Sequence, residues 1–159
     1  MLYKEEIMDN LVTFLALRVF NPAREKILIR RFKRTQVWSI PVIEIKPVDD
    51  DPMNHIERAL NDVKVRPSFK MIAAIPIITM DEEDLIWNEG VRDYLPKIFR
   101  SVIYELQYDG FVCPGLPASL TKSYDLMRWV EPDVLKSMTK LNRPTDILSK
   151  MMEKETCLT

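Results

Sequence analysis

The sequence predicts an α/β protein of the α+β type, in which a mixed β-sheet is sandwiched between helices. Extended apolar segments alternate along the chain with amphipathic segments of helical period, and this order is typical of such a sheet. The chain has 159 residues, of which 47% are hydrophobic and 30% charged, values that suit one compact domain with a buried core. We therefore expect a single domain over residues 1–159, with a poorly ordered tail after about residue 154.

The first two strands are predicted near the N-terminus. Residues 11–20 (LVTFLALRVF) are rich in β-branched and aromatic residues, and residues 26–32 (KILIRRF) alternate between two sides. The dipeptide Asn21-Pro22 between them is a turn signal. The sequence therefore predicts that the two strands pair as a hairpin, with residues 21–25 as the loop.

A third extended segment, residues 36–46, is interrupted by Pro41. Proline removes a hydrogen-bond donor from the ladder, so an edge, a bulge or a bend is expected there. Asp51 followed by Pro52 predicts a helix start, with a capping carboxylate before a proline at the first helical position. The helix is predicted over residues 52–64, because apolar residues recur every three or four positions on one face: Met53, Ile56, Leu60 and Val63.

The remaining elements follow from apolar runs and turn signals. Residues 69–79 form a mostly apolar run that predicts a buried strand, whereas residues 81–94 are compatible with either a short helix or a loop stopped by Gly90. The later segments are, in order, a strand at 97–108, a loop at 111–122, a strand at 124–129, and helices at 131–141 and 145–153.

The net charge argues against one class of partner. The chain carries 23 basic and 24 acidic residues, a formal net charge of −1. Because there is no basic excess to neutralise a nucleic-acid backbone, we expect no duplex nucleic acid as partner. Residues 11–20 are too short to span a bilayer as a helix, and acidic residues precede them, so neither a membrane span nor a signal peptide is predicted. The cytoplasm is the expected location.

The cysteines and the histidine do not form a metal-ligand pattern. Cys113 and Cys157 are far apart in sequence, and His55, the sole histidine, is remote from both. We therefore expect two free thiols in a reducing compartment and no zinc site. His55 is expected on the surface of its helix rather than in a catalytic role.

Three local features occur in an order that a known family shares. The strand KILIRRF is followed by VWSIP, which supplies a Trp-x-x-Pro. An acidic turn and a short amphipathic helix come next (DDDPMNHIERALNDV), and MRWVEPDVLKSM later supplies a tryptophan followed by a helix start. Over roughly residues 10–150 these features resemble the Nudix domain. The resemblance implies a Nudix fold and, in active members, hydrolysis of a diphosphate with Mg²⁺ or Mn²⁺.

The resemblance also locates the positions at which metal ligands are expected. The family's box is a glycine, five residues, a glutamate, seven residues, then Arg-Glu-hydrophobic-x-Glu-Glu-x-Gly. With Arg58 aligned to its arginine, Ala59 replaces the first metal-binding glutamate and Val63 the last, while Asp62 takes the position before Val63. Asp50 lies near the position of the earlier glutamate, within one residue.

These replacements weaken the expected metal site. Hard cations need several oxygen ligands, and carboxylates three or four residues apart on a helix converge on one face. Here that face keeps Asp62, while Val42 and Ile43 stand where glycines normally let backbone amides approach phosphate. Asp50 and Asp62 are the candidate metal ligands and Asp62 is the candidate catalytic residue, with Mg²⁺ or Mn²⁺ as cofactor if the chain is active. We expect hydrolysis to be absent or severely weakened.

Other side chains are candidates for contacting a ligand. Arg30 and Arg31 belong to a basic stretch, residues 30–34, whose guanidinium forks suit a phosphate or an acidic partner. Trp38 has a face on which a base can stack, and Arg58 is a candidate for phosphate contact or for supporting the box by pairing with an acid. The structural alternatives are a solvated strand end for the arginines and core packing for the tryptophan.

We interpret the chain as a Nudix-like domain with a degenerate box that binds a protein or a nucleotide without hydrolysing it, and a homodimer is one form that such a module takes. The alternative is a divergent hydrolase of a nucleoside diphosphate-linked substrate, with metal ligands from Glu82, Glu83, Asp84 or Glu131. A third interpretation is an unrelated α+β domain. Stabilisation by Mg²⁺ with a nucleotide would favour an enzyme or a nucleotide binder, whereas a large apolar surface patch would favour a partner-binding module.

Overall fold

The computed structural model describes residues 11–21, 24–45, 52–62, 70–109 and 124–157. In chain order the elements are β1 (Leu11–Arg18), β2 (Ile27–Phe32), β3 (Trp38–Ser39), β4 (Val42–Ile45), α2 (Pro52–Asp62), β5 (Lys70–Asn88), β6 (Asp93–Asp109), β7 (Tyr124–Val130), α3 (Pro132–Ser137) and α4 (Arg143–Cys157). The strands form a four-stranded sheet in the order β4-β1-β6-β5 and a three-stranded sheet in the order β3-β2-β7. β1 pairs in parallel with β6 and antiparallel with β4, which confirms the predicted mixed sheet.

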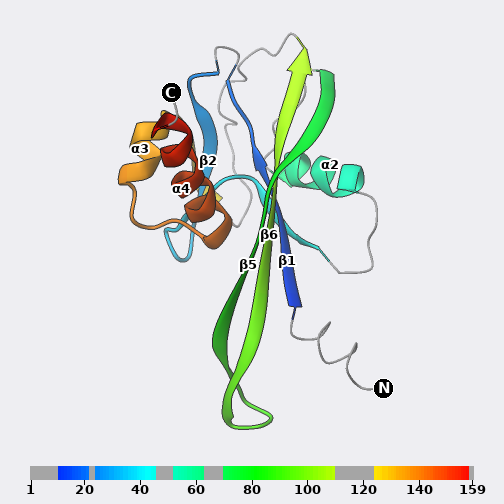
Figure 1. The fold of residues 1–159 in the computed structure, drawn as a ribbon, viewed down its shortest axis with the longest axis vertical. Helices are drawn as coiled ribbons and strands as arrows, with labels where there is room; N and C mark the ends of the chain where they lie inside the picture. Colours follow the sequence, from blue (N-terminus) through cyan, green and yellow to red (C-terminus); the bar gives the residue numbers. More distant parts are fainter. Residues whose placement is uncertain (1–10, 22–23, 46–51, 63–69, 110–123, 158–159) are drawn as a thin grey trace.

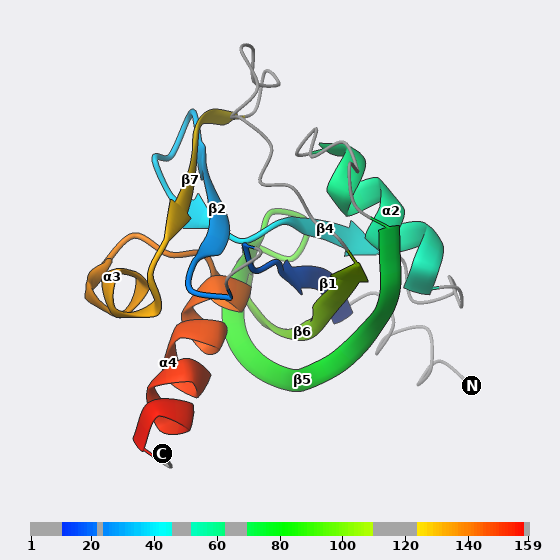
Figure 2. The same cartoon turned by 90° about the horizontal axis from the view of Figure 1, so that it is seen from above.

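Two apolar clusters lie on opposite sides of the four-stranded sheet. One contains Leu15 and Leu17 of β1 together with Ile56 and Ala59 of α2. The other cluster contains Ala16 of β1 and Ile103 of β6, which point to the opposite side of the sheet. They pack there against the second sheet and α4, whose Leu148 is fully buried. Figures 1 and 2 show α2 on one side of the sheet and α4 on the other. The predicted arrangement, a mixed sheet between helices, is therefore confirmed.

The predicted hairpin between the first two strands is wrong. β1 pairs with β4 and β6, whereas β2 pairs with β3 and β7 in the other sheet. The two segments meet past the end of β1, in an antiparallel bridge between Phe20 and Ile27 flanked by two backbone hydrogen bonds, Leu28 N–H to the Val19 carbonyl at 3.0 Å and Asn21 N–H to the Lys26 carbonyl at 2.9 Å. The physical reason is burial, because β1 is buried on both faces from Leu15 onward and such a strand is stabilised in the middle of a sheet.

The interruption at Pro41 is confirmed and divides the segment between the two sheets. β3 lies before the proline and β4 after it, and each joins a different sheet. Pro41 accepts a hydrogen bond through its carbonyl from the Leu17 N–H at 2.9 Å, which holds the connection against β1. A residue without an N–H is suited to this position, where the chain leaves one ladder and enters another.

Residues 81–88 form neither a helix nor a loop, so the sequence interpretation of residues 81–94 is wrong for them, whereas residues 89–92, around Gly90, form a turn. β5 continues through Asn88 and pairs with β6 down to Asp93. The acidic run is extended because it lies opposite basic residues, with Asp81 opposite Arg100 and Asp84 opposite Lys97. The Arg100 guanidinium donates to both carboxylate oxygens of Asp81 at 2.8 and 3.0 Å, and this hydrogen bonding lowers the pKa of Asp81.

A buried ion pair joins β1 to β6. Arg18 and Glu105 face each other in the parallel register, and an Arg18 Nη2 lies 2.9 Å from Glu105 Oε1. Arg24, from the segment after β1, contacts the same oxygen at 3.0 Å, and both guanidinium groups pack over the Phe20 ring. One buried carboxylate is therefore shared by a buried cation, Arg18, and a largely exposed one, Arg24.

The C-terminal helices differ from the prediction at their ends. α3 ends at Ser137 rather than near residue 141, and α4 extends from Arg143 to Cys157 rather than over residues 145–153. Asn142 precedes α4 and its side-chain oxygen accepts hydrogen bonds from Thr145, as a helix-capping residue does. The predicted cap at Asp51, the loop at 111–122 and Cys113 lie outside the described residues. Among the described helices, none combines the length and the hydropathy that a membrane crossing requires.

Candidate functional site

Helix α2 holds the segment that resembles the Nudix box, and it packs against β1 and β4. The helix itself is confirmed; of its predicted apolar face, Ile56 is buried and Met53 is not, and the side chains of Leu60 and Val63 lie outside the described part. Met53 is 40% exposed, whereas Ile56 and Ala59 are 0% and His55 is 3% exposed. The prediction that His55 lies on the surface is therefore wrong, because the helix turns its small residue, Ala59, toward the sheet and carries His55 with it.

Ala59 packs among apolar side chains. It belongs to a cluster whose other buried members are Leu15, Leu17, Val19, Leu28, Ile56, Leu106 and Met127. Hard divalent cations are held by several oxygen ligands, and hydrocarbon side chains supply none. At the position where the resemblance expects the first metal-binding glutamate, the described residues therefore do not fit Mg²⁺ or Mn²⁺.

The two candidate metal ligands are not placed by the structure. Asp50 lies outside the described residues, and Asp62 ends α2 with a side chain that is also outside the described part. Arg58 is exposed, and its Nη1 lies 3.3 Å from His55 Nδ1. Within the part of the chain that the structure describes, Arg58 thus contacts a neighbour on its own helix.

The arginines proposed for ligand contact are engaged with the protein. Arg30 is 1% exposed and its Nη2 donates to the Val42 carbonyl at 3.2 Å, so it ties β2 of one sheet to β4 of the other. The guanidinium of Arg31 lies 5.8 Å from the centroid of the Trp38 ring, and that of Arg128 lies 5.3 Å from it. Arginine therefore contacts the ring that was proposed to stack on a base.

The alternative metal ligands do not converge on α2. Glu82 and Asp84 both pair with Arg143 at the start of α4, on the opposite face of the sheet from α2. Glu83 lies opposite Ile98 on β6, whereas the residue of β6 that packs in the Ala59 cluster is Leu106. Ile98 and Leu106 are eight positions apart, about 26 Å along a strand at 3.3 Å per residue. In the described ranges no group of three or more His, Cys, Asp or Glu side chains is arranged to hold a metal ion.

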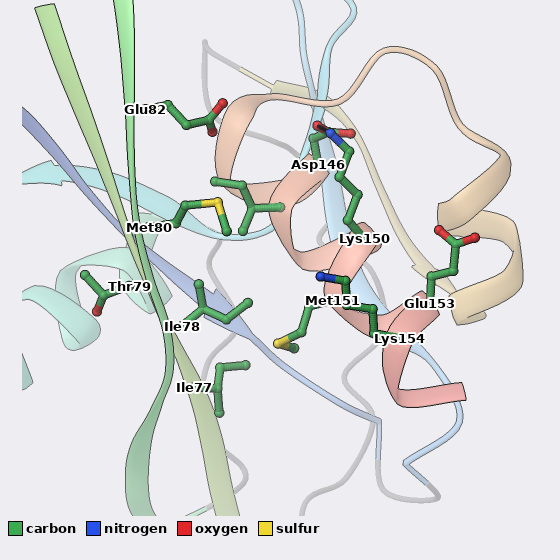
Figure 3. Close-up of a pocket in the computed structure, with 11 residues that line it drawn as sticks. Ile77, Ile78, Thr79, Met80, Glu82, Asp146, Lys150, Met151, Glu153 and Lys154 are labelled. Atoms are coloured by element: carbon green, nitrogen blue, oxygen red, sulfur yellow. Dashed lines mark ion pairs between the residues drawn. The ribbon is translucent and has the colours of Figure 1, made fainter. Parts of the chain in front are cut away.

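A groove that the sequence did not predict lies between β5 and α4 (Figure 3). Its volume is about 1060 Å³. One wall is β5 and the other is α4, so residues some 70 positions apart in sequence face each other across it. The lining residues are Ile77, Ile78, Thr79, Met80, Glu82, Asp146, Ile147, Lys150, Met151, Glu153 and Lys154. A weak signal was present in the i, i+4 spacing of Ile147 and Met151, but nothing in the sequence identified the opposite wall.

The groove has apolar walls and a charged rim. Lys150 pairs with Asp146 at 3.0 Å, and the hydrogen bond that its ammonium donates to this carboxylate raises the pKa of Lys150. In Figure 3 the Glu153 carboxylate points away from β5, whereas Lys154 extends toward it. Among the described residues that line the groove, Lys154 is the cation without a carboxylate within ion-pair distance. The groove therefore combines apolar walls with charges of both signs at its rim, among them the ammonium group of Lys154.

No family model and no curated protein matches the sequence. Solved structures do match. The MutT protein of Methanosarcina mazei Go1 superposes with a TM-score of 0.58 at 14% identity, over 92% of this chain and 95% of that one. A MutT Nudix hydrolase from Burkholderia pseudomallei gives 0.56 at 14% identity, over 88% and 96%. A C. elegans Ap4A hydrolase, solved as a binary complex, gives 0.51 at 11% identity, over 94% and 98%.

The chain therefore has the Nudix fold, as the sequence resemblance implied. The likeness extends over nearly the whole of each matched structure, so the described elements correspond to a complete fold of this kind. At these identities the likeness concerns the fold, and the reaction depends on the side chains at the site.

Proposed function

We propose that this chain is a Nudix-fold binding module that does not hydrolyse its ligand. The observation that carries the proposal is Ala59, which is fully buried in an apolar cluster where the resemblance calls for a metal-binding glutamate. Metal-assisted hydrolysis needs carboxylates that converge on the cation and on the attacking water. The engagement of Glu82 and Asp84 with Arg143 supports the same conclusion, because these carboxylates face α4 and not α2.

We expect phosphate release at the background rate when the protein is incubated with nucleoside diphosphate derivatives and either Mg²⁺ or Mn²⁺. The physical reason is that a single remaining acid on the helix face of the box, Asp62, leaves the cation short of ligands. The measurement is colorimetric phosphate detection across the panel, with an active Nudix hydrolase assayed in parallel. Turnover within the ordinary range of about 1–10³ s⁻¹ that disappears in Asp62→Ala would instead establish a divergent hydrolase.

The groove between β5 and α4 is the binding site that we assign to this module. Its volume of about 1060 Å³ is at the upper end of the range for small-molecule sites, roughly 300–1,000 Å³. Apolar walls from Ile78, Met80 and Met151 favour an apolar body, and Lys154 favours an anionic group. The ligand class is therefore an apolar molecule with one negative charge, and a nucleotide is a poor fit because it carries several charges.

Anilinonaphthalene sulfonate, an aromatic anion whose fluorescence rises in apolar sites, is the probe for this assignment. Met80→Glu is expected to weaken its binding by about tenfold or more, because the new carboxylate adjoins the bound sulfonate or its rings. Met53→Glu is the matched control, since Met53 is similarly exposed but lies on α2 across the sheet. Equal losses in the two variants, or none in either, would exclude the groove as the site, whatever the hydrolysis assay shows.

A further inference from the structure

The hairpin of β5 and β6 extends past the rest of the sheet. β1 pairs with β6 from Leu11 opposite Ile98 onward. Beyond that point residues 84–88 of β5 and residues 93–97 of β6 pair with each other, and no other described strand adjoins them. Figure 1 shows this end of the hairpin projecting from the body of the protein. β5 is also an edge strand, so within the described chain its outer edge is not paired with another strand. A two-stranded ribbon of this kind is only marginally stable alone.

The projecting ribbon exposes large apolar side chains. Leu85 is 65% exposed, Trp87 46%, Val91 61% and Tyr94 58%. Trp87 lies opposite Tyr94 with the rings 5.3 Å apart edge to face, and Leu85 follows on the same face because side chains alternate along a strand. Aromatic side chains offer about 150–250 Å² each, so this stripe is of the size that marks contact sites on soluble proteins.

The same segment carries a strong negative charge. Residues 81–93 contain six acidic residues against one basic residue, Arg92, and the acids are Asp81, Glu82, Glu83, Asp84, Glu89 and Asp93. Glu82 and Asp84 share one guanidinium, that of Arg143, so one negative charge remains between them. Glu83 and Glu89 have no ion pair with the described residues. The ribbon therefore combines exposed aromatic surface with uncompensated carboxylates.

The negative charge of the ribbon disfavours several kinds of binding partner. Nucleic acids and anionic membranes are repelled by the carboxylates. A second copy that paired edge to edge about the acidic run would set Asp81 opposite Asp84 and Glu82 opposite Glu83, and like charges directly opposite each other are destabilising. A basic and partly apolar protein segment satisfies both the charge and the exposed stripe.

We propose that residues 81–97 form a docking arm for a basic and partly apolar extended protein segment, added as a strand to the outer edge of β5. Strand addition satisfies the free main-chain groups of an edge, and alternate side chains provide selectivity. Side chains alternate along β5, so Glu83 shares a face with Leu85 and Trp87. Glu82 and Asp84 lie on the other face, where Arg143 pairs with both. The added strand therefore meets apolar and acidic side chains together on the face of Leu85. The arm is independent of the groove and of whether the protein hydrolyses a ligand.

The test uses a fluorescently labelled peptide of alternating lysine and valine, with binding followed by anisotropy. The full chain is expected to bind it, and the Glu83→Lys/Glu89→Lys variant is expected to bind it about tenfold or more weakly. Glu44→Lys is the matched control, because Glu44 is exposed on β4, the opposite edge of the same sheet. This control is expected to bind like the wild type.

Two further peptides separate strand addition from general charge attraction. A lysine–valine peptide N-methylated at alternate residues loses the main-chain donors of one edge, and we expect it to bind about tenfold more weakly. An alternating glutamate–valine peptide is expected not to bind. Equal binding of the methylated peptide, equal binding by the charge-reversed variant, or no binding to the wild type would overturn the proposal. A dimer in analytical ultracentrifugation that is lost in Trp87→Ser would also overturn it, by making a second copy the occupant.

Discussion

Replacing Ala59 with glutamate is expected to lower the free energy of unfolding by about 3–5 kcal/mol. Although this change restores the residue that an active Nudix box would carry, Ala59 is fully buried among leucine, isoleucine, valine and methionine side chains. The carboxylate would be removed from water without a partner, and the larger side chain would also disturb the packing of α2 on β1. The substitution is therefore expected to damage the fold and not to restore catalysis.

Urea denaturation at neutral pH measures this effect. Asn54→Glu is the matched control, because it makes the same residue on the same helix at an exposed position and is expected to change the free energy of unfolding by less than about 0.5 kcal/mol. A stable Ala59→Glu protein with Mg²⁺-dependent turnover would contradict both the burial argument and the proposed function.

Replacing Glu105 with glutamine is expected to lower the free energy of unfolding by about 3 kcal/mol or more. The substitution keeps the shape of the side chain but removes the charge that two guanidinium groups approach at 2.9 and 3.0 Å. The Arg18 side chain is only 8% exposed, so its charge would lose a carboxylate partner without gaining water. Breaking a buried pair from one side is costly for this reason.

Two companion variants locate the source of this effect. Arg24→Gln is expected to cost less than about 1 kcal/mol, because the Arg24 side chain is 57% exposed and its charge is screened. The double variant Arg18→Met/Glu105→Leu is expected to recover part of the stability lost in Glu105→Gln, since it removes both buried charges together. If Glu105→Gln unfolds at the same urea concentration as the wild type, the pair contributes nothing measurable.

The helix and the strand segments of the first half were predictable because their signals are local. The aspartate–proline start and the three- to four-residue spacing predicted α2, and Pro41 predicted the break between β3 and β4. The prediction for residues 81–94 failed because the structure of the acidic run depends on interactions that are distant in sequence. Their acidic run has no intrinsic preference for a strand, and it is extended because Arg100 and Lys97 lie opposite it.

The site was predictable only in part. The replacement of a glutamate by Ala59 was visible in the sequence once the box was aligned. The burial of His55, the engagement of Arg30 with Val42 and the groove beside Met80 were not visible. Each of these depends on which element packs against which, and helical or strand periodicity does not contain that information.

The sequence alone therefore determined roughly where most elements lie, that the chain has the outline of a Nudix domain, and that its box lacks glutamates. Tertiary structure decided that β1 and β2 enter different sheets, that Ala59 is sealed in an apolar cluster, and that β5 and α4 enclose a groove. The physical reason is the range of the interactions. Local spacing acts over three or four residues, whereas the pair of Arg18 and Glu105 joins residues 87 positions apart, and burial is the sum of many such contacts.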